Sequence, residues 1–315
     1  MDGQRGGNGV SSRLSRRGLI TLGAAVCAGM IASRHVHADG IDTLDGPVPD
    51  PPGALAPAVR GARYQETPPP EPPSPPASTR PPFRPGEFIA SIATSRKIVV
   101  LTFDDGPDKT HDLAIANILR SRGYEGKATF FCVGRNVRSF PGVVRQLFDR
   151  GYTIGNHTMT HAHYDTRTEA AEIGPCQEVI RRVTGEYPWA FRAAGGSTGG
   201  AIDAACAARG LAYIWTTGDE GDWKSPRLSA GTINARFASA LHPGYISLRH
   251  SGGSHDDTVA AMSSMLDIIE SRGYEVTSLA DALAMRNGAG VQTQSAESVF
   301  ADGTVPGPGG SDAPH

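Results

Sequence analysis

Residues 97–107 read Lys-Ile-Val-Val-Leu-Thr-Phe-Asp-Asp-Gly-Pro, an apolar run that ends in two adjacent carboxylates. A short apolar run rich in β-branched residues and followed by turn residues predicts a buried strand. The Gly-Pro pair predicts that the strand stops directly after Asp105. Asp104 and Asp105 are therefore expected at the carboxyl end of a buried strand. Because successive residues of an extended chain point in opposite directions, one carboxylate would bind a metal and the other would activate water.

Six further apolar runs follow this strand, and amphipathic helical patterns lie between several of them. These runs cover residues 128–133, 152–156, 189–192, 211–215, 245–248 and 274–277. Strands that alternate with helices predict a parallel sheet with crossover helices. We expect an α/β fold, a barrel of about seven parallel strands spanning about 190 residues. A doubly wound open sheet is the alternative that periodicity alone leaves open.

Polar residues follow five of the predicted strands. They are Asp104 and Asp105 after the first strand, His157 after the third, Arg192 at the end of the fourth, Asp219 to Trp223 after the fifth and His250 after the sixth. The carboxyl ends of parallel strands open on one face, where active sites of such folds lie. The sequence therefore predicts that these groups converge on one site.

The segment His157-Thr158-Met159-Thr160-His161 carries two imidazoles at positions i and i+4. If the segment is helical, both rings lie on one face and share a cation. Asp105 would complete a set of three nitrogen and oxygen ligands with open positions for water and substrate. His111, His242 and His255 are interpreted as ordinary histidines without a role in the chemistry.

Five motifs occur in the order found in the polysaccharide deacetylases of carbohydrate esterase family 4, the NodB homology domain. The motifs are Thr-Phe-Asp-Asp-Gly-Pro at 102–107, the His157–His161 segment, Arg192, Asp-Glu-Gly-Asp-Trp at 219–223, and Leu248-Arg249-His250. The chain resembles that family over residues 96–286. The resemblance implies a deformed (β/α) barrel and metal-dependent removal of acetyl groups from N-acetylated sugars.

The resemblance also implies a role for each motif residue. Asp105, His157 and His161 would bind a divalent metal, zinc first, with cobalt or nickel as alternatives for the same ligand set. Asp104 would be the base, held by Arg192, and His250 the acid, oriented by Asp222. Gly195, Trp223 and Leu248 would bind the substrate.

One motif departs from the family pattern. The family reads Arg-x-Pro-Tyr-Gly where this chain has Arg192-Ala193-Ala194-Gly195-Gly196. The aromatic ring is missing, whereas the backbone N–H that the family uses as an oxyanion donor is retained at Gly195. A Gly-Gly pair is ordered only at greater entropic cost.

Two flanks and a signal surround the predicted domain at 96–286. Arg13, Arg16 and Arg17 precede a short apolar stretch, so residues 1–38 resemble a twin-arginine export signal. The alternative is a basic tail beside an apolar helix. Residues 39–95 hold 15 of the 24 prolines, all between Pro47 and Pro85, and predict an extended linker. Residues 287–315 predict a disordered tail. We expect an exported protein that is extracellular or associated with the cell wall.

The composition excludes several classes of protein. The chain has 315 residues, with 30 Lys and Arg against 32 Asp and Glu, a balance that excludes a basic nucleic-acid surface. No run of 18 apolar residues follows the N-terminus, which excludes a multi-span membrane protein. Three cysteines, Cys132, Cys176 and Cys206, would remain after export, and they allow at most one disulfide.

The function expected from the sequence is removal of N-acetyl groups from a polysaccharide of the peptidoglycan or chitin type, and no protein partner is indicated. Two alternatives remain open. The first is an esterase that removes O-acetyl groups from xylan. The second is a non-catalytic glycan-binding relative, for which the departure at Ala194-Gly195 is the only support.

Overall fold

A computed structural model of the chain describes residues 81–162, 165–224 and 226–286. The predicted export signal, the linker up to residue 80 and the C-terminal tail lie outside these described residues. In the described part, no helix has the length and apolar character needed to cross a membrane.

All strands that the described residues form pair in parallel within one sheet. They are β1 (Phe88–Ile89), β2 (Ile98–Gly106), β3 (Ala128–Cys132), β4 (Thr153–Asn156), β5 (Ala190–Phe191), β6 (Ala212–Ile214), β7 (Tyr245–Ile246), β8 (Arg249–His250) and β9 (Glu275–Val276). The order is β1-β6-β5-β4-β3-β2-β7, with β8 and β9 also paired to β2. The Thr217 N–H after β6 donates to the Ile246 carbonyl of β7 at 2.9 Å, which draws the two sides of the sheet together. The fold is thus the predicted α/β barrel of parallel strands in a deformed form, and all seven predicted strands are present.

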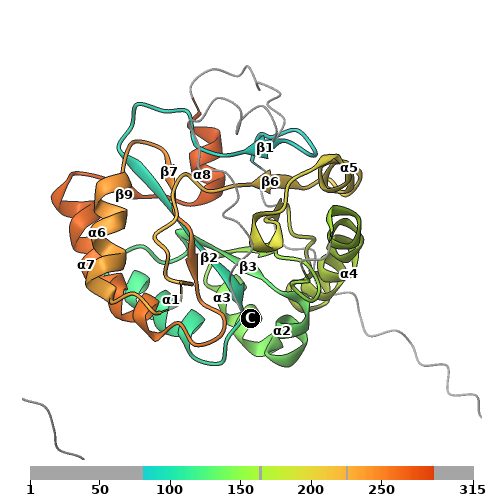
Figure 1. Cartoon of the computed structure of the whole chain (residues 1–315), viewed down its shortest axis with the longest axis horizontal. Coiled ribbons are helices and arrows are strands. Elements are labelled where there is room, and N and C mark those ends of the chain that lie inside the picture. The colour runs from blue at the N-terminus through green and yellow to red at the C-terminus, as the bar shows by residue number, and fades with distance from the viewer. Residues whose placement is uncertain (1–80, 163–164, 225, 287–315) are drawn as a thin grey trace, which may run out of the picture. The chain divides into compact units, whose positions relative to one another are not determined.

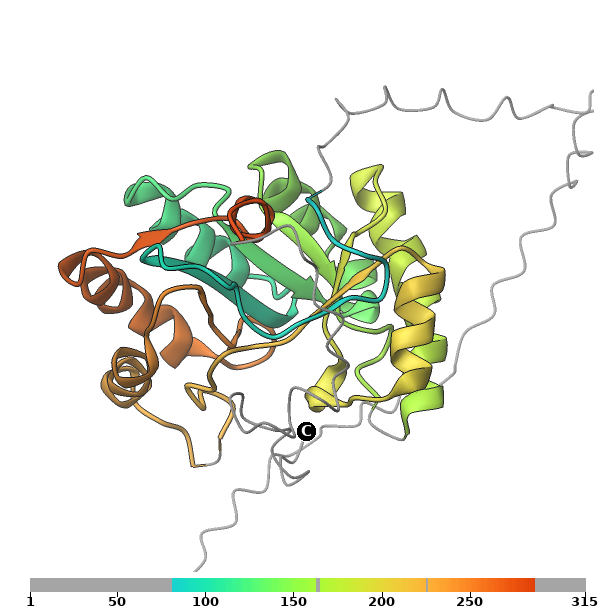
Figure 2. The ribbon, with the colours of Figure 1, turned by 90° about the horizontal axis from the view of Figure 1, so that it is seen from above.

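Helices lie around this sheet (Figures 1 and 2). They are α1 (His111–Ser121), α2 (Gly134–Ser139), α3 (Pro141–Asp149), α4 (Thr166–Thr184), α5 (Gly200–Ala208), α6 (Ala230–Ala240), α7 (Asp256–Ser271) and α8 (Leu279–Ala284), with a short 3₁₀ turn η1 (Ala194–Gly196). Asp165 directly precedes α4 as its N-cap, and its side chain accepts hydrogen bonds from the backbone N–H groups of Arg167 and Thr168.

Both faces of strand β2 are buried. Val99, Leu101 and Phe103 pack into one apolar cluster with α1, α3 and α7, whereas Ile98 and Val100 pack into a second cluster with α8. Alternate residues of a strand point to opposite faces, so a run that is apolar at almost every position suits a strand covered on both sides. This packing fixes the position of the carboxylates that follow.

The domain begins earlier than the sequence predicts. Residues 88–89 fall inside the predicted linker at 39–95, yet Phe88 pairs with Tyr213 and Ile89 with Ile214 as strand β1. The linker prediction is wrong for this segment. The many prolines before it favoured an extended linker, whereas its short apolar run becomes buried when it pairs with the edge of β6. β8 was likewise not predicted as a separate strand.

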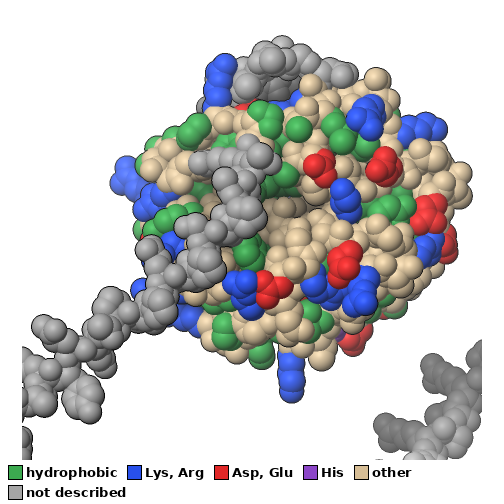
Figure 3. Space-filling model, turned by 180° about the vertical axis from the view of Figure 1, so that it is seen from behind, with side chains coloured by type: hydrophobic (Ala, Val, Ile, Leu, Met, Phe, Trp, Pro, Cys, Tyr) green, Lys and Arg blue, Asp and Glu red, His purple; other side chains and the backbone are tan. Residues whose placement is uncertain are grey.

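Cys132, Cys176 and Cys206 are buried thiols that form no disulfide with one another. Burial raises the pKa of the Cys206 thiol above its usual value, and the pKa of Cys176 to about 12. On the face of the molecule drawn in Figure 3, basic and acidic side chains are interspersed.

Candidate metal and acid-base site

The end of β2 changes direction at the two carboxylates. The pairing of β2 with β3 shifts register between Phe103 and Gly106, and Asp105 has a φ of 70°. Such a bulge re-aims side chains at the edge of a site. Asp105 Oδ1 lies 3.3 Å and Asp104 Oδ2 3.8 Å from Nε2 of His157. The prediction that the carboxylates point apart is therefore wrong, because left-handed backbone at Asp105 turns both toward one imidazole.

The segment from His157 to His161 is a loop and not the helix on which a shared face of the two imidazoles was conditional. Thr158 and His161 have φ values of 66° and 59°, a backbone region that residues other than glycine seldom occupy. Two local hydrogen bonds hold this loop. The Asn156 side chain accepts from the Thr158 N–H at 3.0 Å, and the Thr158 hydroxyl accepts from the His161 N–H at 3.1 Å. The two imidazole rings consequently lie 5.0 Å apart.

Asp105, His157 and His161 form a group whose candidate ligand atoms all lie within 4.8 Å of one another. Nε2 of His161 is 3.0 Å from Oδ1 of Asp105. The Arg192 carbonyl accepts a hydrogen bond from Nδ1 of His157 at 2.8 Å, which leaves the lone pair of neutral His157 on Nε2. That lone pair then faces a carboxylate oxygen, and a cation between the two would relieve their repulsion.

Charge in this group agrees with a cation site. Burial opposes ionisation of Asp105, but when His157 and His161 are protonated their hydrogen bonds to the carboxylate hold its pKa well below the usual value. A carboxylate and two imidazoles are the ligand types of catalytic zinc sites with open positions. The residues present thus fit a divalent metal.

A buried ion pair fixes Asp104. Arg192 is 2% exposed, and its Nη1 donates to Asp104 Oδ1 at 2.8 Å and to the Thr102 hydroxyl at 2.6 Å. The guanidinium also lies over the Phe131 ring at 4.2 Å. One oxygen of Asp104 is therefore committed to Arg192, and the other faces His157.

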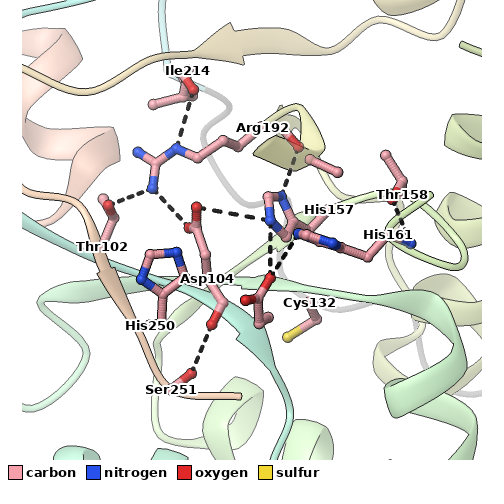
Figure 4. Close-up of polar contacts among 12 residues, drawn as sticks. Thr102, Asp104, Cys132, His157, Thr158, His161, Arg192, Ile214, His250 and Ser251 are labelled. Atoms are coloured by element: carbon pink, nitrogen blue, oxygen red, sulfur yellow. Dashed lines mark hydrogen bonds and ion pairs between the residues drawn. The ribbon is translucent and has the colours of Figure 1, made fainter. Parts of the chain in front are cut away.

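His250 and Asp222 form a second pair beside the first. His250 on β8 stands opposite Asp104 on β2 in the strand register. Asp222 accepts from Nδ1 of His250 at 2.7 Å and from its backbone N–H at 2.8 Å, and Thr258 donates to the same carboxylate. Burial opposes the charged imidazole, but the Asp222 carboxylate raises the pKa of His250 to about 10. Figure 4 shows Asp104, His157, His161 and His250 gathered in one place.

The three predicted substrate residues lie on loops at this edge of the sheet. Gly195 in η1 is exposed with a φ of 55°, and its N–H donates to no group among the described residues. Trp223 directly follows Asp222, and its indole Nε1 donates to Asp219 at 3.0 Å. The Leu248 N–H donates to the buried carboxylate of Glu220 at 3.2 Å.

Sequence reasoning missed three residues near the site. The ring of His255 stacks on His250 with centroids 5.3 Å apart, although the sequence interpretation gave His255 no role. Glu220 and Glu169 are buried acids, each 1% exposed, that accept hydrogen bonds from loop backbone at the site. The position of Glu220 inside the Asp219–Trp223 motif is a signal that could have found it, whereas Glu169 has no such signal.

Comparison with known proteins shows which proteins this chain is similar to. A family model described as polysaccharide deacetylase matches residues 91–214. A peptidoglycan-N-acetylglucosamine deacetylase of Bacillus cereus is 28% identical over 207 residues, covering 64% of this chain and 95% of that protein. A chitooligosaccharide deacetylase of Bradyrhizobium sp. is 31% identical over 217 residues, covering 60% of this chain and 96% of that protein.

Solved structures agree with these relatives. The family 4 carbohydrate esterase from Streptomyces lividans, in complex with acetate, is 28% identical with a TM-score of 0.54. The alignment covers 62% of this chain and 99% of that one. The Bc1960 peptidoglycan N-acetylglucosamine deacetylase is 27% identical with a TM-score of 0.57, over 62% of this chain and 92% of that one.

Proposed function

This chain belongs to the polysaccharide deacetylase family, and on that basis we propose that it is an exported, metal-dependent hydrolase that removes N-acetyl groups from a polysaccharide. The relatives named for peptidoglycan N-acetylglucosamine and chitooligosaccharides support a substrate of one of these two types. The observation that carries the proposal is the meeting of a metal-ligand group, a buried aspartate base and an aspartate-bound imidazole at one edge of the sheet.

Asp105, His157 and His161 would hold the divalent metal. When bound, such an ion polarises the acetyl carbonyl and lowers the pKa of water toward about 7. The Arg192 carbonyl on Nδ1 of His157 keeps that imidazole in the tautomer that a ligand needs. Zinc suits this ligand set, and cobalt or nickel would bind it too.

Asp104 acts as the base that takes the proton from the attacking water. Its ion pair with Arg192 favours the carboxylate form and holds one oxygen in place. The other oxygen is directed to the same place as the ligand atoms, so proton removal and attack occur together.

His250 acts as the acid that protonates the departing amine nitrogen. An amine leaves poorly unless it is protonated, so this proton decides amide cleavage. Asp222 keeps the imidazole charged and oriented through its hydrogen bond to Nδ1, and it also accepts from the backbone N–H of His250. The Gly195 N–H serves as a donor to the developing oxyanion, and Leu248 and Trp223 line the substrate groove.

Acetate release tests this proposal. The purified chain, loaded with zinc and separately with cobalt, is incubated with peptidoglycan, chitin oligomers and acetylated xylan. We expect about one divalent ion per chain and acetate from at least one of the first two substrates. A chain that binds no divalent ion and releases no acetate from any of them would contradict the proposal and favour a glycan-binding role.

An O-acetyl esterase is the second candidate, because one related structure is named a family 4 carbohydrate esterase. The alkoxide that leaves an ester needs less help from an acid than an amine does. Acetate from xylan alone in the panel would favour this candidate.

Export depends on residues 1–38, which act as a twin-arginine signal, with 39–80 as a linker and 287–315 as a tail in this proposal. Replacing Arg16 and Arg17 together by lysine tests the signal. We expect the full-length variant to accumulate inside the cell, and unchanged export would refute the twin-arginine route.

A further inference from the structure

The first two turns of α4 present two carboxylates to two different loops of the site. Glu172 accepts hydrogen bonds from the Thr160 N–H at 2.9 Å and from the Thr160 hydroxyl, inside the loop that carries the imidazoles. Glu169, one turn earlier, accepts from the Ala194 N–H at 2.6 Å in η1. Residues three apart lie on the same side of a helix, so one helix contacts both loops.

The loop at η1 needs support from outside. Gly195 and Gly196 both have left-handed backbone, with φ values of 55° and 78°, and glycine has little conformational preference of its own. The bonds within the turn are long, at 3.5 Å from Gly196 to Ala193 and 3.3 Å from Ser197 to Ala194. The bond to Glu169 holds this turn at Ala194, while the Tyr213 hydroxyl donates to the Ser197 carbonyl at its other end.

Ala194 makes this bond necessary. Its residue is fully buried, and a buried N–H without an acceptor is costly. In the related motif a proline stands here and offers no N–H. This chain therefore has an additional buried donor directly before Gly195, and a carboxylate 25 residues away in sequence accepts its hydrogen bond.

We propose that Glu169 is a positioning residue that fixes Ala194 and thereby aims the Gly195 N–H at the reacting carbonyl. This inference rests on the proposed function, because it assigns Gly195 as the oxyanion donor. Burial raises the pKa of Glu169, and an oxygen remains available to accept the bond in either protonation state. The loop therefore requires a hydrogen-bond acceptor at position 169 and not a negative charge.

A cycle of four variants tests the contact. Glu169→Met removes the acceptor at similar size, and Glu169→Gln retains it. Ala194→Pro removes the donor. Proline fits at this position because the preceding Ala193 has φ −72° and ψ 141°, the extended region that proline demands of its neighbour. The fourth variant combines Glu169→Met with Ala194→Pro.

The expected results separate positioning from bulk stability. Glu169→Met should lower kcat about tenfold, less than the ~10²–10³-fold loss of a whole oxyanion donor, with KM and metal content unchanged. It should lower the Tm by about 3 °C or more, because the Ala194 N–H is left without a partner. Glu169→Gln should stay within about twofold of the parent in kcat. The double variant should regain most of the kcat and Tm that Glu169→Met loses.

Glu172→Met is the matched control, since it removes a carboxylate from the same helix that holds the other loop. We expect it to reduce metal content and to gain nothing from Ala194→Pro.

Two outcomes would overturn the inference. A double variant no better than Glu169→Met in Tm would show that the contact does not matter, whatever the reaction. Equal losses of kcat in Glu169→Gln and Glu169→Met would show that charge matters and not the acceptor. A parent chain that releases no acetate from any substrate overturns the proposed function instead, and the Tm cycle still decides the contact.

Discussion

Replacing Asp222 by asparagine should move the alkaline limit of amide cleavage to lower pH. His250 must carry its proton to act as the acid, and the Asp222 carboxylate 2.7 Å from its Nδ1 raises the pKa of His250 to about 10. Asparagine removes that charge, so the pKa returns toward its ordinary value of ~6.5. The loss of one of two acceptors also disorients the ring, which lowers the rate at every pH.

The pH-dependent part of the loss follows from these values. At pH 7 the parent imidazole is almost fully protonated, whereas the variant would be about one quarter protonated at pH 7 and about 3% at pH 8. The ratio of variant to parent kcat should therefore fall nearly tenfold for each pH unit above about 7.

Acetate release from a chitin oligomer at saturating concentration, measured from pH 6 to pH 9 with metal content checked at each pH, gives this ratio. Asp219→Asn is the control, because Asp219 lies on the same loop and bonds to Gly221 and Trp223 instead of His250. A ratio for Asp222→Asn that stays constant across this range would refute the assignment of His250 as an acid tuned by Asp222.

Three further predictions concern the metal, the leaving group and stability. His161→Ala should reduce bound zinc from about one ion per chain to a small fraction in metal analysis, because two of three ligands seldom retain a catalytic ion, and full retention would contradict the ligand assignment. His250→Ala should lower amide cleavage about 10²-fold or more while an activated acetate ester is cleaved at a nearly unchanged rate, and equal losses on both substrates would contradict the acid role. Burial raises the pKa of Glu220 from 4.5 to about 7, so its contribution to stability is present below pH 4.5 and is lost as pH rises through 7. The free energy of unfolding of the parent, measured with urea, should therefore decline by about 3 kcal/mol between pH 4.5 and 7, whereas Glu220→Gln should lack this decline. The same dependence on pH in both proteins would refute the prediction.

Much of the fold could be predicted because each strand of the core is a short apolar segment. The predicted runs at 97–103, 128–133 and 152–156 correspond to β2, β3 and β4. β1 could not be predicted in the same way, since Phe88 and Ile89 become buried only when the edge of β6 is present. A two-residue strand has too little pattern of its own.

The site was predicted in composition more than in geometry. Asp105, His157 and His161 lie together as expected, but they do so through left-handed backbone at Asp105, Thr158 and His161 and not through a helix. No local preference of Asp, Thr or His predicts that conformation, which costs free energy and persists only where surrounding contacts hold it.

The order of residues along the chain was enough to predict most segments of the core and the side chains at the strand ends, because burial patterns and strand-end motifs are local. The tertiary structure alone decided where those side chains point and what holds them. The bulge after Phe103, the pairing of His250 beside Asp104 and the contact from Glu169 to Ala194 each join elements distant along the chain or reverse the local backbone. Such features depend on the packing of the whole domain, since no single segment contains both partners.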